Sequence, residues 1–261
     1  MDYAKKLKVI SINATGYDNV DLEEANKRSI GVCPVGEYAT KDVAEFTISM
    51  MLTLIKNMKE YTYDVEKNYK WRYDFPKSNK RVEEMTLGIF GLGKIGKEVA
   101  KKAINLGMKV IAYDPYVNSL EEKLDVRMVD LHELLAEADV ISNHMNLNET
   151  NYEIFNYKMF KKMKKKPYFI NMGRGASIVE NDLVRALDEE LLRGAGLDLL
   201  ADETPNLKIH PLVGKENVII TPHAAFYTST SIKELQRIST ENIVNYLNDE
   251  KQKVFKLVSE N

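Results

Sequence analysis

Residues 86–106 read Thr86-Leu-Gly-Ile-Phe-Gly91-Leu-Gly93-Lys-Ile-Gly96-Lys-Glu-Val-Ala-Lys-Lys-Ala-Ile-Asn-Leu106. The first five residues are an apolar run that ends at a glycine-rich turn, as in a buried strand. The residues after the turn place apolar side chains at spacings of four, four and three, namely Ile95, Val99, Ala103 and Leu106. This spacing predicts a helix with one apolar face against a sheet.

The three glycines of this turn are those that a dinucleotide requires. Gly91 permits the tight turn, Gly93 lets backbone N–H groups approach a pyrophosphate, and Gly96 lets helix and strand pack closely. The helix N-terminus adds N–H donors and a positive dipole end. Asp114 ends the next predicted strand, where a carboxylate accepts hydrogen bonds from a ribose and repels a 2′-phosphate. The pattern therefore predicts NAD rather than NADP.

A nucleoside triphosphate loop is the alternative for the same glycines. Gly88, Gly93 and Lys94 satisfy most of that motif. Ile95, however, occupies the position of the Ser or Thr that would bind magnesium, so this alternative is excluded.

Apolar runs and helical patterns alternate along the whole chain. Strands are expected at Lys8–Asn13, Ile30–Val35, Thr86–Phe90, Val110–Asp114, Val140–His144, Tyr168–Asn171, Ala195–Leu199 and Val218–Thr221. Helices are expected at Val43–Lys67, Ile95–Leu106, Leu131–Glu137, Asn181–Glu190 and Ser231–Asn248, with a polar connection at Tyr69–Glu84. Repeated strand-helix-strand units with continuously apolar strands predict an α/β fold with a doubly wound parallel sheet, the Rossmann dinucleotide-binding domain.

Composition excludes several classes of function. The 37 basic and 39 acidic residues give a net charge of −2, which gives no support to a nucleic-acid or membrane partner. Cys33 is the only cysteine, so an internal disulfide and a cysteine-rich zinc site are excluded, and no histidine or cysteine pair has metal-ligand spacing. The most apolar stretch, Phe46–Ile55, is shorter than the roughly 20 residues of a membrane-spanning helix. We expect a cytoplasmic protein without a metal.

Polar residues follow three other predicted strands directly. Arg174 follows one strand, Asp198 with Asp202-Glu203 follows the next, and His223 follows the last. Because ligands of an open α/β sheet lie at the carboxyl ends of its strands, these side chains are expected to converge near the phosphate loop. Arginine could clamp a carboxylate, histidine could exchange a proton, and Glu203 could orient the imidazole.

Each of these three side chains, taken alone, also fits an ordinary position on a loop or in a surface ion pair. The other histidines are less informative. His132 and His210 fit solvated or loop positions, whereas His144, at the end of a strand, fits either a cofactor-lining or a core position.

Several motifs together resemble the D-isomer-specific 2-hydroxyacid dehydrogenases, and the likeness covers essentially the whole chain. These motifs are Ala14–Asp21, Gly91–Gly96, Asn171–Ala176, Gly196–Asp198 and Thr221–Thr228. The last, with Phe226-Tyr227 after the histidine, is most similar to the D-lactate dehydrogenase branch. The resemblance implies an NAD-dependent oxidoreductase that interconverts a 2-keto acid and a D-2-hydroxy acid.

The resemblance also implies roles for individual residues. The catalytic set falls on Arg174, Glu203 and His223, because Glu203, rather than Asp202, has the family's spacing from Asp198. The cofactor-binding set falls on Gly91, Gly93, Lys94, Ile95, Gly96, Asp114, Met145, Asn146, Asn151, Met172, Gly173, Arg174 and Asp198. Substrate contacts are expected from Thr15, Gly16, Tyr38 and Arg174.

The resemblance further implies how the chain is divided. Residues 1–37 are expected to form part of a flavodoxin-like substrate-binding domain that starts late and is incomplete, residues 38–226 the NAD-binding domain, and residues 227–261 a C-terminal helix that returns to the substrate domain. The family's usual association implies a homodimer. One departure is Asn146, which stands where the family usually has proline.

Two alternatives to a D-lactate dehydrogenase-like enzyme stay open. The chain could be an NAD-binding interaction module that does not turn its cofactor over. Within the same family it could also be a phosphoglycerate or glyoxylate reductase.

Overall fold

The structure is a computed structural model that describes residues 3–17, 19–77, 79–117 and 124–259. Asp18 of the Ala14–Asp21 motif and Ser78 of the Tyr69–Glu84 connection therefore lie outside the described residues. The chain forms two compact units, a larger unit of residues 43–225 and a shorter unit of residues 1–42 with 226–261. The functional domains expected above, at 1–37, 38–226 and 227–261, remain predictions.

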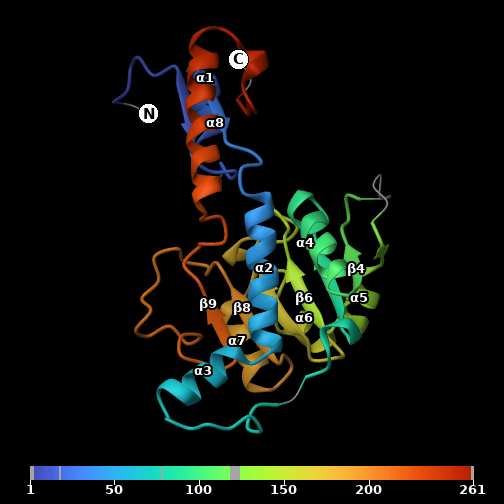
Figure 1. The fold of residues 1–261 in the computed structure, drawn as a ribbon. Helices are drawn as coiled ribbons and strands as arrows, with labels where there is room; N and C mark the ends of the chain where they lie inside the picture. The colour runs from blue at the N-terminus through green and yellow to red at the C-terminus, as the bar shows by residue number, and fades with distance from the viewer. Residues whose placement is uncertain (1–2, 18, 78, 118–123, 260–261) are drawn as a thin grey trace. The chain divides into compact units, whose positions relative to one another are not determined.

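The larger unit is built on one parallel sheet. Among the described residues its strands are ordered β5-β4-β3-β6-β7-β8-β9 (Figure 1). Their bounds are β3 Thr86–Phe90, β4 Lys109–Tyr113, β5 Val126–Met128, β6 Val140–Asn143, β7 Tyr168–Asn171, β8 Gly194–Leu197 and β9 Val218–Ile220. The predicted doubly wound parallel sheet is confirmed. Chain order reverses between β3 and β6, and a dinucleotide binds at such a switch point.

Helices cover both faces of this sheet. The helices and turns of the larger unit are α2 Thr40–Ile55, which begins before residue 43, α3 Met58–Glu66, η1 Val82–Glu84, α4 Lys94–Asn105, α5 Leu131–Glu137, α6 Tyr157–Lys162, η2 Gly175–Ser177 and α7 Glu180–Asp188. Within the described residues, no helix combines the length and the apolar character needed to cross a bilayer.

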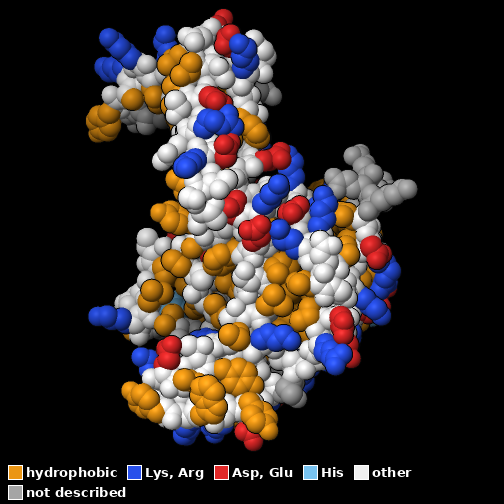
Figure 2. Space-filling model, viewed as in Figure 1, with side chains coloured by type: hydrophobic (Ala, Val, Ile, Leu, Met, Phe, Trp, Pro, Cys, Tyr) orange, Lys and Arg blue, Asp and Glu red, His pale blue; other side chains and the backbone are white. Residues whose placement is uncertain are grey.

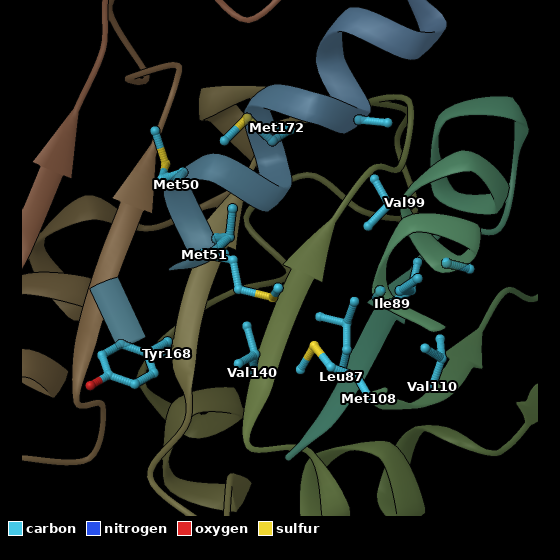
Figure 3. Close-up of a cluster of buried hydrophobic side chains, with 14 of the residues drawn as sticks. Met50, Met51, Leu87, Ile89, Val99, Met108, Val110, Val140, Tyr168 and Met172 are labelled. Atoms are coloured by element: carbon cyan, nitrogen blue, oxygen red, sulfur yellow. The ribbon is translucent and has the colours of Figure 1, made fainter. Parts of the chain in front are cut away.

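Strand residues alternate between the two faces, as the pleat of a strand requires. Leu87 and Ile89 of β3 lie in one core cluster with residues of α2 and α4, and Figure 3 shows Met50 and Met51 of α2 near β-strand side chains such as Val140. Phe90 lies in the other cluster with residues of α5, α6 and α7. Both faces of the sheet are therefore buried from solvent, which explains why the strand sequences are continuously apolar.

The expectation of one helix over Val43–Lys67 is wrong. The segment forms two helices, because Asn57 adopts a left-handed backbone with φ of 51° and ends the ladder of the first helix. Asparagine tolerates this conformation better than most residues. Its side-chain amide also donates to the carbonyl of Lys77 at 3.2 Å, which ties the break to the connection that follows α3.

Apart from the 3-10 turns, three short elements among the described residues had no predicted counterpart. They are α1 Leu22–Lys27, α6 and β5. Asp21 and Asn156 cap the two helices by accepting the N–H groups of Glu24 and Met159, a signal that the sequence contains. β5 has three residues, too few for an alternating pattern, and only its pairing with β4 defines it as a strand.

Asp139, buried between α5 and β6, ties the start of β3 to two lysines. Its carboxylate accepts the N–H of Thr86 at 3.0 Å and lies 3.3 Å from Lys80 Nζ and 3.2 Å from Lys165 Nζ. Burial alone would raise the pKa of Asp139, but the Thr86 N–H and the two ammonium groups together lower it below its ordinary value.

We expect Asp139→Asn to lower the free energy of unfolding at pH 7 by about 2 kcal/mol, since hydrogen bonds to a charged group are lost. The folded-state pKa lies below the unfolded one, so this stabilisation is complete above the unfolded value of about 3.9 and is lost as pH falls through the folded value. Urea unfolding at pH 7 and below pH 3 measures the difference. Glu23→Gln, in the exposed pair with Lys27, is the control and should change the free energy of unfolding little. If wild type and Asp139→Asn still differ in stability below pH 3, the charge of Asp139 is not the stabilising feature.

The shorter unit holds a separate core. Among its described residues, β1 Val9–Ile12 pairs in parallel with β2 Gly31–Pro34, and α8 Ser229–Leu247, followed by η3 Lys251–Lys253, packs on both strands. The ring of Tyr246 packs directly on Gly31, where a Cβ would lie 2.2 Å from the ring. Cys33 lies buried in β2, and burial raises its pKa to about 11, which disfavours the thiolate at neutral pH.

Candidate active site

The phosphate loop has the geometry expected of its three glycines. Gly91 has φ of +84°, and a Cβ on Gly96 would lie 2.2 Å from the carbonyl oxygen of Gly91, so neither position accepts a side chain. A Cβ on Gly93 would meet nothing within 4 Å. Gly93 is therefore not required by protein packing, and the open space beside it fits the close approach of a pyrophosphate to the backbone.

Asp114, just past the end of β4, connects that strand to the phosphate loop. Its Oδ2 accepts the N–H of Leu92 at 2.8 Å and its Oδ1 accepts the N–H of Tyr116 at 2.9 Å. Lys94 and Ile95 form the first turn of α4 beside the same loop. The carboxylate is thus fixed where a ribose would lie, so the residues present fit an NAD molecule.

Two buried amides, with no individual role predicted from the sequence, join the ends of β6 and β7. Asn143 of β6 donates to Asn171 Oδ1 of β7 at 2.8 Å, and its own Oδ1 accepts the N–H of Met145 at 3.1 Å. Asn171 in turn accepts the N–H of Gly173 and donates to the carbonyl of Arg174. The sequence did contain a signal for this network, because Asn143 and Asn171 are polar residues at the ends of apolar strands.

The other predicted cofactor residues lie along this edge of the sheet. Met172 is buried and Gly173 has no room for a Cβ, which would lie 2.8 Å from the carbonyl oxygen of Met145. Asn151 is buried, donates to the carbonyl of Asn146 at 2.7 Å and accepts the N–H of Asn148 at 2.8 Å. Both amide atoms of Asn151 therefore hold the loop together.

His144 lies directly after β6, at the switch point. Its Nε2 is 2.9 Å from Ser142 Oγ, and Nδ1 is buried with no hydrogen-bond partner among the described residues. Burial lowers its pKa to about 3. His144 is therefore neutral at physiological pH and does not act as the proton donor.

His223 and Glu203 come together at the carboxyl edge of the sheet. His223 Nδ1 lies 3.7 Å from Glu203 Oε1, and the two side chains are 46% and 69% exposed. His223 holds a left-handed backbone with φ of 52°, an uncommon conformation that stores strain at functional sites. A cavity of about 770 Å³ borders the pair, with apolar walls that include Leu207 and Leu212.

Asp198 holds the backbone that carries His223. The residue is 1% exposed. Oδ1 accepts hydrogen bonds from the Thr221 hydroxyl at 2.6 Å and from the N–H of Ala224 at 2.9 Å, and Oδ2 accepts one from the N–H of Ala225 at 3.0 Å. The carbonyl of Asp198 accepts the N–H of His223 at 2.7 Å. Asp198 was predicted as a cofactor contact, and the structure adds this supporting role.

We expect Asp198→Asn to lower the free energy of unfolding by about 3 kcal/mol. The new amide would aim a donor at one of the two N–H groups, Ala224 or Ala225, and leave a buried donor without an acceptor. Thermal or urea unfolding measures this loss. Thr221→Val, which removes only one of the contacts, should cost about 1 kcal/mol, and an equal loss in the two variants would argue against the carboxylate as the organising group.

Arg174 follows β7, the neighbour of β8 in the sheet. Its Nη1 donates to the carbonyl of Gly173 at 3.0 Å, which holds the guanidinium against its own loop. The next residue, Gly175, packs against the loop that leads to Glu203, since a Cβ there would lie 1.9 Å from the carbonyl oxygen of Leu200. Strands β7, β8 and β9 are adjacent, so Arg174, Glu203 and His223 follow three neighbouring strands.

The predicted substrate residues Thr15, Gly16 and Tyr38 belong to the shorter unit. Thr15 Oγ1 donates to the carbonyl of Gly36 at 2.8 Å, and the ring of Tyr38 lies edge-on to Phe226 with centroids 6.2 Å apart. Their contact with substrate stays a prediction. Within the described residues, no three His, Cys, Asp or Glu side chains are grouped as metal ligands.

Comparison with known proteins identifies the family. Residues 48–225 match the family model described as D-isomer specific 2-hydroxyacid dehydrogenase, NAD binding domain. The chain is 36% identical over 247 residues to a hydroxypyruvate reductase of Blautia hydrogenotrophica, which covers 92% of this chain and 76% of the relative. It is 34% identical over 242 residues to a D-lactate dehydrogenase of Streptococcus agalactiae, covering 88% and 73%.

Solved structures agree with this match. The D-lactate dehydrogenase of Aquifex aeolicus, complexed with NAD and lactic acid, superposes with a TM-score of 0.88 at 31% identity, covering 98% of this chain and 81% of that one. A D-2-hydroxyisocaproate dehydrogenase gives a TM-score of 0.89 at 28% identity, covering 99% and 82%. The predicted oxidoreductase class and NAD as the cofactor are confirmed at the level of the family. The chain belongs to the D-isomer specific 2-hydroxyacid dehydrogenases.

Proposed function

We propose that this protein reduces a small 2-keto acid to the D-2-hydroxy acid with NADH, with pyruvate and D-lactate as the first pair to test. The observation that carries the proposal is the 3.7 Å pairing of His223 with Glu203 at the carboxyl edge of the dinucleotide sheet. Arg174 follows the strand beside them. An imidazole can donate a proton to the ketone oxygen, a carboxylate can orient the imidazole, and a guanidinium can bind the substrate carboxylate.

The larger unit would hold NAD at the switch point. Gly93 and the first turn of α4 would receive the pyrophosphate, Asp114 the adenosine ribose, and the β6 and β7 loops the nicotinamide. NAD, when bound, supplies or accepts the hydride. The predicted contacts at Met145, Asn146, Met172 and Asp198 belong to this path.

Arg174 would bind the substrate carboxylate with its planar fork and polarise the ketone. Because Nδ1 of His223 faces Glu203, we assign proton transfer to Nε2. His223 would donate this proton to the oxygen that becomes the hydroxyl, while Glu203 stabilises the protonated ring. The substrate contacts at Thr15, Gly16 and Tyr38 remain predictions of the family resemblance.

The test is an assay of NADH oxidation by the purified chain with pyruvate, longer 2-keto acids, hydroxypyruvate and glyoxylate. Turnover with chiral analysis giving the D-product supports the proposal, and the ranking of substrates separates a lactate-type enzyme from the other reductases. NADH binding without turnover of any 2-keto acid would instead favour an NAD-binding interaction module. Cytoplasmic location also remains a prediction.

We also propose that the protein is a homodimer through an aromatic surface of the larger unit. Tyr69, Trp71 and Tyr73, in the connection after α3, are between 84% and 93% exposed, and Figure 2 shows hydrophobic atoms gathered in that region. Asp64 fixes the segment, because its carboxylate accepts two hydrogen bonds from Arg72. An ordered, exposed aromatic patch is typical of a protein interface.

We expect Trp71→Ser to weaken the dimer at least about thirtyfold, since a buried aromatic anchor contributes about 2 kcal/mol or more to an interface. Analytical ultracentrifugation over a range of protein concentrations measures the dissociation constant. Tyr3→Ser, at another fully exposed aromatic residue, is the control. A wild-type protein that sediments as a monomer at all concentrations would contradict the proposed assembly.

A further inference from the structure

The loop that carries Glu203 has little burial of its own. Residues 201–204 and 206–209 are exposed, whereas Leu200 and Leu212 on either side are 8% and 0% exposed. Glu203 is itself 69% exposed. Its position beside His223 therefore depends on the backbone of this segment rather than on packing of its side chain.

One carboxylate joins both flanks of the exposed segment. Glu180, the first residue of α7, accepts the N–H of Ala201 with Oε1 at 2.8 Å. Its Oε2 lies 3.3 Å from His210 Nε2, and the two side chains are only 24% and 11% exposed. Ala201 precedes Glu203 by two positions and His210 follows it by seven, so Glu180 fixes both ends of the segment that contains Glu203.

The contacts of His210 fix its tautomer. Its Nδ1 faces the N–H of Leu212 at 3.4 Å, and a backbone N–H can only donate, so Nδ1 is the acceptor. Nε2 then carries the proton and donates to Glu180. A neutral imidazole therefore satisfies both neighbours, and the buried Leu212 anchors the ring to the core of the larger unit.

We infer that Glu180 and His210 form a loop clamp that positions Glu203 for its pairing with His223. The inference rests on the proposed function, because it makes these two side chains positioning residues for the proton donor. The contacts within the segment are local, such as Asp202 Oδ1 accepting the N–H of Thr204 at 2.8 Å. Such local turns shape the segment but do not tie it to the sheet.

Glu180→Ala removes the clamp, and Asp182→Ala is its matched control. Asp182 lies in the same first turn of α7 and also accepts a backbone N–H, from Tyr157 of α6 at 2.8 Å, outside the Glu203 loop. We expect Glu180→Ala to lower kcat for keto-acid reduction by about tenfold to a hundredfold, the effect of misplacing a catalytic group. The KM for NADH should stay unchanged, and Asp182→Ala should lose less than about twofold.

A double-mutant cycle with Glu203→Gln separates positioning from a general structural effect. If Glu180 acts through Glu203, its loss costs no more than about twofold in kcat once Glu203 is already replaced. Losses that multiply in the double variant would overturn the inference. Should Glu180→Ala fail to fold, His210→Ala removes half of the clamp and is expected to give a smaller loss with the same dependence on Glu203.

Two measurements test the clamp without turnover. Glu180→Ala should speed amide hydrogen exchange at Ala201 at least tenfold, and it should move the ring resonances of His223 toward those of Glu203→Gln, whereas Asp182→Ala should do neither. An unchanged Ala201 amide and unchanged His223 ring signals would refute the clamp. If these changes occur in a protein that turns over no 2-keto acid, the clamp stands and the proposed function fails.

Discussion

His223→Ala is expected to lower kcat for keto-acid reduction by about a thousandfold, because general acid catalysis by one side chain contributes factors of this size. The dissociation constant for NADH should stay within about threefold of the wild-type value, since the imidazole acts on the substrate oxygen. Single-turnover kinetics and NADH fluorescence titration measure the two quantities. His132→Ala, at an exposed histidine of α5, should change neither.

The pH dependence of this variant gives a second check. Reduction requires the protonated ring of His223 and oxidation requires the neutral ring, so the wild-type rates of the two directions should respond to pH in opposite ways. This opposite pH dependence of the two rates should disappear in His223→Ala. A variant that loses NADH binding as strongly as turnover would show instead that His223 supports the cofactor site.

Arg174→Lys is expected to lower kcat/KM for the 2-keto acid by about a hundredfold, mostly through KM. Lysine keeps the positive charge but loses the planar fork that binds a carboxylate with two parallel hydrogen bonds. It also lacks the geometry of the contact in which Arg174 Nη1 donates to the carbonyl of Gly173. Initial-rate kinetics over a range of keto-acid concentrations measure the change.

A substrate without the carboxylate isolates the role of the guanidinium. The methyl ester of the same keto acid should lose less than about fivefold in kcat/KM on Arg174→Lys, because it presents no charge to bind. Arg185→Lys serves as the control, because Arg185 of α7 forms a surface pair with Glu189, the residue after the helix. An equal loss for acid and ester would place Arg174 outside the carboxylate-binding role.

Much of the larger unit could be predicted from local pattern. The run from Thr86 to Leu106 specified β3, the turn and α4 nearly to the residue, since apolar spacing and glycine positions are properties of neighbouring residues. The prediction failed at Asn57, where a left-handed residue interrupts a continuous helical pattern. Periodicity does not register a single backbone angle, so the break was not visible in the spacing.

The candidate site was predictable in part. Strand-ending polar residues and the family's spacing selected Glu203 and His223, and the structure places them 3.7 Å apart. The same approach treated His210 as an uninformative loop histidine, although it contacts Glu180 at 3.3 Å. Glu180 and His210 belong to no shared motif, and the parallel pairing of β7 with β8 brings the segments that follow these strands together.

The sequence alone was enough to predict the α/β class, the phosphate loop and the preference for NAD. These predictions rest on the spacing of apolar residues, on the backbone angles that glycine permits and on a carboxylate that follows a strand, such as Asp114. Each of these features involves only a few neighbouring residues. Folding in three dimensions settled which polar groups meet: Asp198 beneath the His223 loop, Glu180 across the Glu203 loop, and a desolvated His144. Those contacts join residues far apart in the chain, and their energies depend on burial and partner distance, which no local pattern contains.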